Sequence, residues 1–147
     1  MPSIKLYTIG FTQKSAEAFF SAIKNAGIKR VFDIRLNNVS QLAGFAKRDD
    51  LIFFLDRLCG CEYKHIPLMA PTDDILEDFR KKRIGWPGYE IRFNTLIQER
   101  KIEKIVSPRT LHKTCLLCSE PEPDKCHRRL VAEYLSKKFD GIEIKHL

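Results

Sequence analysis

The sequence predicts a single α/β domain with a mostly parallel sheet of about five strands flanked by helices. Short apolar runs, typical of buried strands, alternate along the chain with segments whose apolar residues recur at helical spacing. Glycine and proline residues separate these segments, and no linker, repeat or low-complexity stretch interrupts them. This alternation favours a parallel sheet, because each parallel connection crosses over the sheet and usually carries a helix.

The first half of the chain predicts three strands separated by two helices. Strands are expected at residues 4–9, 30–35 and 62–66. The helices are expected at residues 15–26 and 48–59, where the apolar side chains share one helical face. A glycine follows each of these helices, and glycine is the residue that most often ends one.

The second half predicts three helices and two strands. One helix begins near residues 71–74, where a capping threonine precedes two aspartates, and the next covers residues 86–100. The apolar runs at residues 114–118 and 142–146 are expected to be strands. Residues 126–138, which lie between these two strands, are expected to form the last helix.

Composition indicates an ordinary globular protein with anionic partners. The hydrophobic content is 44% and the net charge is +7, which favours nucleotides, phosphorylated metabolites or nucleic acid as partners. No apolar run reaches the roughly 18 residues that a membrane span needs, so no membrane partner is expected. The first residues are typical of a strand and not of a secretory signal, so we expect a cytoplasmic protein. Its five cysteines are therefore expected to be reduced.

The most informative segment is LLCSEPEPDKCHRR at residues 116–129. It places a carboxylate (Glu120), a thiol (Cys126), an imidazole (His127) and a guanidinium (Arg128) where a strand leads into a helix. Open α/β sheets bind ligands at the carboxyl ends of their strands. The start of a helix also presents unpaired N–H groups and a positive dipole end, which favour an anion. The segment therefore predicts an anion-binding site.

Three residues of this segment are candidates for catalysis, and each has a structural alternative. Glu120 is the best general acid or base, because the apolar strand before it would disfavour its charged form; the alternative is a carboxylate that caps the loop. Cys126 is a candidate nucleophile because its basic neighbours favour a thiolate; the alternative is that its side chain only packs where the helix meets the sheet. His127 is expected to donate a hydrogen bond to a ligand or to Glu120; the alternative is that it bonds only a structural partner.

The second predicted strand also ends in charge. Asp33 and Arg35 are two residues apart and therefore point to the same face of the strand. In one interpretation they form a structural ion pair, because an arginine is the usual partner of a buried carboxylate. In the other, Asp33 orients Arg35, which then binds an anion through its forked donors. If the strands are parallel, Arg35 and Arg128 should flank one phosphate-sized position.

Several known chemistries do not fit the spacing. A cysteine phosphatase loop would place an arginine six residues after Cys126, where this chain has Ala132. Neither a P-loop nor a GxGxxG motif is present, and no cofactor is indicated. Cys115 and Cys118 have a redox-like spacing but should face opposite sides of a strand. The cysteines and His127 lack the paired CxxC arrangement of a zinc site, so no metal site is predicted.

Motifs at the strand ends resemble those of a known family. They are TIG at residues 8–10, DIR at 33–35, YKH at 63–65, and LLC-x-E with CHR at 116–128. Over nearly its whole length the chain resembles the domain of unknown function 488 family. The resemblance implies a single α/β domain and carries over a set of site residues: Thr8, Gly10, Asp33, Arg35, Ser40, Tyr63, His65, Cys118, Glu120, Cys126, His127 and Arg128.

The chain departs from the family pattern in two places. Phe11 and Thr12 stand where many members have histidine and serine, so the role of that histidine is lost or taken by another residue. Asn38 stands where many members have a proline, which implies a looser loop before Ser40.

Two functions from different classes fit the sequence. The first is an enzyme that acts on a phosphorylated or nucleotide-like small molecule. In this enzyme Arg35 and Arg128 would bind the anion, while Glu120, His127 or Cys126 would perform the chemistry. The second is a non-catalytic module that binds nucleic acid or a nucleotide through the same basic edge. A carboxylate with a perturbed pKa beside a closed pocket would favour the enzyme, and a continuous basic stripe leaving the pocket would favour the module.

Overall fold

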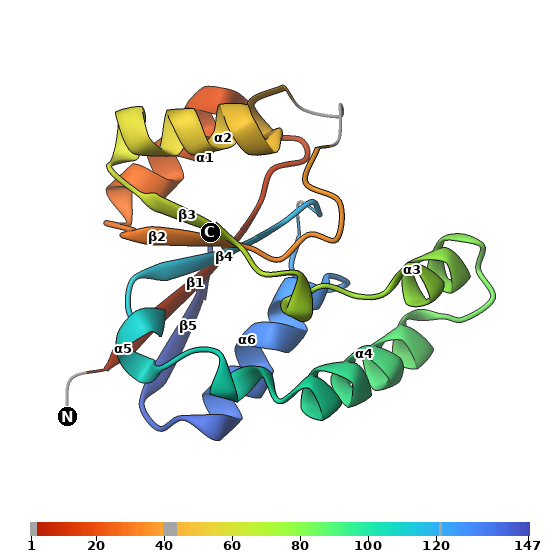
Figure 1. The fold of residues 1–147 in the computed structure, drawn as a ribbon. Coiled ribbons are helices and arrows are strands. Elements are labelled where there is room, and N and C mark those ends of the chain that lie inside the picture. Colours follow the sequence, from red (N-terminus) through yellow and green to blue (C-terminus); the bar gives the residue numbers. More distant parts are fainter. Residues whose placement is uncertain (1–2, 40–43, 121) are drawn as a thin grey trace.

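The computed structural model describes residues 3–39, 44–120 and 122–147, and its centre is a parallel sheet of five strands (Figure 1). The strand order is β3-β2-β4-β1-β5, and every neighbouring pair is parallel. The predicted fold class is confirmed. The strands are β1 (Ile4–Gly10), β2 (Arg30–Asp33), β3 (Glu62–His65), β4 (Thr114–Cys118) and β5 (Ile142–His146).

Six α-helices flank this sheet. They are α1 (Ala16–Asn25), α2 (Arg48–Phe54), α3 (Asp73–Arg80), α4 (Trp86–Arg100), α5 (Pro108–Leu111) and α6 (His127–Lys138). The helix expected at 48–59 ends its α-helical part at Phe54 and continues as a π-helical turn, Leu55–Cys59. The one-turn helix α5 was not predicted, because four residues carry no periodic pattern. Among the described residues, no helix has both the length and the apolar character needed to cross a lipid bilayer.

The helices cover the two faces of the sheet with two apolar cores. Helices α1 and α2 cover one face, where Phe19 and Leu51 are fully buried. Helices α4 and α6 cover the other face, where Phe93 and Val131 are fully buried (Figure 1). Side chains of a strand alternate between the two cores, so Cys115 and Cys118 face opposite sides, as predicted.

The connections that follow the neighbouring strands β1 and β4 cross the sheet in opposite directions, and we call this a reversal of chain direction. From β1 the chain passes through α1 toward β2 and β3, on the face that α1 and α2 cover. From β4 it passes through α6 in the opposite direction, to β5, on the other face. Because β1 and β4 are neighbours, their connections leave the sheet on opposite faces. Such a reversal opens a crevice beyond the carboxyl ends of the strands, where open α/β sheets bind ligands.

Gly10 ends β1 in close contact with the loop that follows β4. A Cβ atom at this position would lie 1.7 Å from the carbonyl oxygen of Glu120 and 2.7 Å from Nη1 of Arg128. A real side chain does not tolerate such distances, and the nearer atom belongs to the backbone. Glycine is therefore required at this position so that the loop from β4 to α6 can pack against the end of β1.

We expect the substitution Gly10→Ala to lower the free energy of unfolding by at least about 2 kcal/mol, because the added methyl group must displace the Glu120 backbone. Urea unfolding followed by circular dichroism measures this change. The matched control is Gly44→Ala, since an added Cβ there meets no atom within 4 Å. Equal stability of the two variants would contradict this account of Gly10.

Candidate functional site

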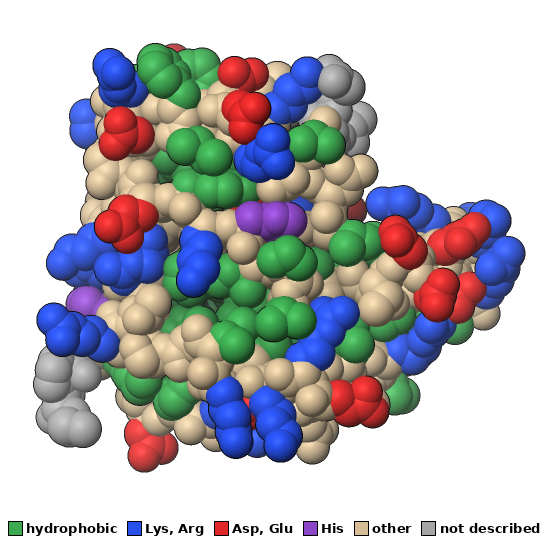
Figure 2. Space-filling model, in the orientation of Figure 1, with side chains coloured by type: hydrophobic (Ala, Val, Ile, Leu, Met, Phe, Trp, Pro, Cys, Tyr) green, Lys and Arg blue, Asp and Glu red, His purple; other side chains and the backbone are tan. Residues whose placement is uncertain are grey.

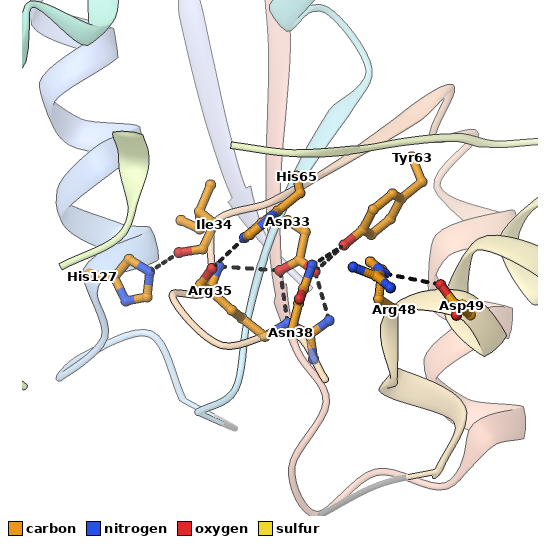
Figure 3. Close-up of polar contacts among 9 residues, drawn as sticks. All are labelled: Asp33, Ile34, Arg35, Asn38, Arg48, Asp49, Tyr63, His65 and His127. Atoms are coloured by element: carbon orange, nitrogen blue, oxygen red, sulfur yellow. Dashed lines mark hydrogen bonds and ion pairs between the residues drawn. The ribbon is translucent and has the colours of Figure 1, made fainter. Parts of the chain in front are cut away.

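The carboxylate of Asp33, at the end of β2, is surrounded by four donors (Figure 3). Arg35 donates to one carboxylate oxygen from its backbone N (3.2 Å) and its Nε (2.8 Å). The other oxygen accepts from Nη2 of Arg35 (2.7 Å) and from the hydroxyl of Tyr63 (2.5 Å). Burial and the hydrogen bond to Asp33 raise the pKa of the Tyr63 hydroxyl, so Tyr63 stays a donor near neutral pH.

Arg35 and Asp33 form the ion pair that the sequence predicts. Asp33 is fully buried, and 4% of Arg35 is exposed. Two guanidinium nitrogens of Arg35 bind the two carboxylate oxygens, which is the forked geometry that arginine favours. The guanidinium also lies 5.3 Å from the centre of the Phe11 ring. These contacts fix the direction of the Arg35 side chain, as both interpretations of the pair require.

Two histidines hold the backbone of the same segment. Nε2 of His127 bonds the carbonyl oxygen of Ile34 at 2.6 Å, and Nε2 of His65 bonds that of Arg35 at 2.8 Å (Figure 3). A carbonyl oxygen only accepts, so both imidazoles carry their proton on Nε2. The start of α6 and the end of β3 thus hold the chain where it leaves β2.

His127 is a neutral imidazole in the folded protein. Burial lowers its pKa to about 4, the charge of Arg128 acts in the same direction, and the Ile34 carbonyl and Asp33 oppose them. The ring also packs edge-on against Phe93, with the centroids 5.5 Å apart. His127 therefore offers a hydrogen-bond donor at Nε2 and an acceptor at Nδ1 near neutral pH.

Arg128 is fully buried and joins β1 to the loop after β4. Its Nε donates to the hydroxyl of Thr8 (3.2 Å), and its Nη1 donates to Sγ of Cys118 (3.3 Å) and to the carbonyl oxygen of Glu120. The Thr8 hydroxyl is also hydrogen-bonded to Nδ1 of His146 at 2.5 Å. Arg128 thus positions the loop that carries Glu120.

The two cysteines of the LLCSEPEPDKCHRR segment are bonded to each other. A disulfide joins Cys118, at the end of β4, to Cys126, the N-cap residue of α6. The expectation that all the cysteines are reduced is therefore wrong for this pair, because the fold brings the two thiols together across the loop. Cys59, Cys61 and Cys115 are free. Burial raises the pKa of the Cys61 thiol to about 12, which suits a packing role.

A cavity of about 420 Å³ opens at the carboxyl edge of the sheet, between the strand ends and the α3–α4 pair. Its lining combines cationic and aromatic residues. The cationic residues are Arg35, Arg80 and Lys125, and the aromatic residues are Phe79, Trp86 and Tyr89. The rings of Trp86 and Tyr89 stack with centroids 4.9 Å apart. Such a cavity suits a ligand that has both a flat ring and an anionic group.

The structure divides the predicted site residues into two groups. Five of them line the cavity: Arg35, Cys118, Glu120, Cys126 and His127. Six support the lining from behind: Thr8, Gly10, Asp33, Tyr63, His65 and Arg128. Ser40 lies outside the described residues. Glu120 is exposed, so the apolar strand before it does not bury its side chain as we expected.

Three residues that α3 and α4 contribute to the cavity were not predicted from the sequence: Phe79, Arg80 and Tyr89. Phe79 and Trp86 pack edge to face, at 5.9 Å, and Tyr89 lies beside both rings. Arg80 follows Phe79 at the end of α3 and is exposed. Aromatic residues on both sides of a helix–helix turn are the signal that could have indicated this wall.

Fold and site together define a parallel α/β protein with a ligand-sized cavity at the carboxyl ends of its strands. The chain belongs to the family described as Domain of unknown function DUF488, whose model matches residues 15–135. The resemblance seen in the motifs is therefore confirmed. Neither the curated proteins nor the solved structures include a match to this chain.

We expect Asp33→Asn to lower the free energy of unfolding by about 3–5 kcal/mol, because Arg35 would remain buried without its counter-charge. Asp49→Asn is the matched control: Asp49 pairs with Arg48 at 3.0 Å, but 82% of its side chain is exposed, so the loss should stay below about 1 kcal/mol. Chemical denaturation measures both. A similar small loss in the two variants would show that the buried pair does not stabilise the fold.

We expect stability to fall as the pH is lowered from about 6.5 to about 4. His127 has a lower pKa in the folded protein than in the unfolded chain, so acid protonates the unfolded chain first and favours unfolding. The contribution is on the order of 3 kcal/mol, present above pH 6.5 and lost toward pH 4. His127→Gln should flatten this part of the stability–pH curve, whereas His112→Gln should not. An unchanged slope in His127→Gln would contradict the assignment.

Proposed function

We propose that this protein is an enzyme that acts on a small, phosphorylated, nucleotide-like molecule bound at the carboxyl edge of its sheet. The observation that carries the proposal is the cavity that both cationic and aromatic residues line. Its place beside the reversal of chain direction between β1 and β4 adds support, because open α/β proteins use this position for ligands.

The cationic residues would bind the phosphate. Arg35 is held by Asp33 before any ligand arrives, so little conformational freedom is lost on binding. Lys125 is exposed at the rim, just before α6, whose N-terminal N–H groups favour an anion. In this proposal Arg128 does not touch the ligand and instead positions the loop after β4.

The aromatic wall would bind the ring of the ligand. Trp86 is half-buried and offers a ring beside Phe79 and Tyr89. A base stacked on such a ring gains about 1–3 kcal/mol, whereas a sugar phosphate without a base gains no such contact. The proposal therefore favours a nucleotide-like ligand over a simple sugar phosphate.

Glu120 is the residue we assign to proton transfer. It lines the cavity and is exposed, and its backbone carbonyl is held by Arg128, which fixes the position of the residue. A carboxylate within hydrogen-bond reach of a bound ligand can accept or donate a proton. His127 lines the same cavity with its Nδ1 acceptor.

A small ligand also agrees better with the charge on the visible surface than an extended nucleic acid does. Figure 2 shows basic and acidic side chains interspersed over the α3–α4 region, without one unbroken basic stripe. Several basic residues there are paired with acids, as Lys81 is with Glu77 (2.6 Å) and Arg92 with Asp78 (2.6 Å). A binding module for long nucleic acid would need more free basic surface.

The test is a binding panel of nucleoside monophosphates, ribose phosphate, inorganic phosphate and short oligonucleotides. Trp86 is the only tryptophan, so its fluorescence reports directly on the cavity. We expect mononucleotides to quench this fluorescence and to raise Tm more than ribose phosphate does. Lys125→Ala and Arg80→Ala should each weaken binding about tenfold, while the exposed controls Lys81→Ala and Lys137→Ala should not.

Turnover separates the enzyme from the binding module. Each ligand that binds is incubated with the protein and its loss is followed by mass spectrometry. Glu120→Gln should retain binding and lose turnover. Tighter binding of oligonucleotides than of mononucleotides, with a steep salt dependence and no turnover, would overturn the proposal in favour of the non-catalytic module.

A further inference from the structure

Two cysteines and a histidine lie together where β4 ends and α6 begins. Cys118 is the last residue of β4, Cys126 is the N-cap of α6, and His127 is the first residue of that helix. One ligand atom from each residue lies within 4.8 Å of the other two, and all three residues are buried. We propose that these three residues bind a zinc ion once the disulfide between the two cysteines is reduced.

The spacing and the donor types fit zinc. Zn–S bonds of about 2.3 Å and Zn–N bonds of about 2.0 Å place the ligand atoms of a tetrahedral site about 3.5–4 Å apart. The three ligand atoms lie within 4.8 Å of one another, and reduction of the disulfide frees the two sulfur atoms to move apart to this spacing. Thiolate and imidazole ligands select zinc over magnesium or calcium, which prefer oxygen. A strand end and a helix start hold the three residues, so the site lies on regular secondary structure.

The orientation of His127 is that of a metal ligand. Its Nε2 bonds the carbonyl oxygen of Ile34 at 2.6 Å, which leaves Nδ1 as the nitrogen with an available lone pair. Histidines that bind metals almost always donate their other N–H to a carbonyl or carboxylate, which fixes the ring. Phe93 packs against the ring and limits its rotation further.

The sulfur of Cys118 has a similar supporting contact. Nη1 of Arg128 donates to Sγ of Cys118 at 3.3 Å. A donor with a positive charge stabilises the thiolate, which is the form that binds the metal. Both Cys118 and His127 thus have neighbours that prepare them as ligands.

Three protein ligands leave the fourth zinc position open, and the cavity lies beside it. Cys118, Cys126 and His127 all line that cavity. Zinc sites with three protein ligands hold water or substrate in the fourth position, where the ion acts as a Lewis acid or activates water. The metal-site inference does not rest on the proposed function, because metal binding is measured without any organic ligand.

The two thiols therefore have two exclusive states. A dithiol reductant gives two electrons and two protons to the Cys118–Cys126 bond, which becomes two thiols, and the reductant becomes a cyclic disulfide. Zinc binding then releases one proton from each thiol. The oxidised pair has no thiolate and does not bind the ion.

The test uses cobalt(II) as a coloured substitute for zinc, with the full chain stripped of metal by a chelator. We expect the reduced protein to bind one cobalt ion per chain with thiolate-to-cobalt charge-transfer absorption, which zinc then abolishes by displacement. The oxidised protein should show no such absorption. The same wild-type chain serves in both arms, so the comparison does not depend on whether a variant folds.

Variants identify the ligands. Cys118→Ser and Cys126→Ser should each weaken cobalt binding by at least about a hundredfold. Cys59→Ser is the matched control, because its thiol packs against the other core, and it should bind as wild type does. Absence of charge-transfer absorption in the reduced wild type, equal binding by the oxidised protein, or equal loss in Cys59→Ser would overturn the proposal.

Discussion

The carboxylate of Asp33 is the constraint on which the rest of the site depends. A fully buried charge is costly unless it is paired, and four hydrogen bonds from Arg35 and Tyr63 meet that requirement. The pairing also fixes the segment that follows β2, because three of the four donors come from a residue only two positions further on. The segment after Asp33 is then close enough for His127 and His65 to bind its carbonyl groups.

These contacts prepare the cavity before a ligand is present. Arg35 is oriented by a carboxylate and an aromatic ring, and the segment that carries it is fixed to α6 and β3. On the other side, Arg128 ties the loop after β4 to β1. Groups that are held in place in this way lose little entropy on binding and can be aimed at a developing charge. The buried polar network thus positions the groups that line the cavity.

Much of the fold follows from the sequence, because buried parallel strands appear as apolar runs and the helices between them have a clear period. The strand-end residues could also be placed at one edge, since parallel strands all end there. Which of them face the cavity could not be predicted, because this depends on side-chain direction: Arg35 lines it, while Thr8 and Arg128 lie behind the lining. The aromatic wall depends on how α3 and α4 pack together, and the Cys118–Cys126 bond depends on how the loop between β4 and α6 closes; neither follows from the residue pattern alone.

The outermost strands of the sheet, β3 and β5, have a consequence for association. Both are short, four and five residues, and they alternate partly buried side chains with exposed charges such as Lys64 and Lys145. Such strands offer few backbone groups to a further strand, and their lysines disfavour edge-to-edge addition of another copy. Addition of a further strand to either edge of the sheet is therefore disfavoured, and so is cross-β aggregation. The crevice at the carboxyl ends of the strands stays accessible.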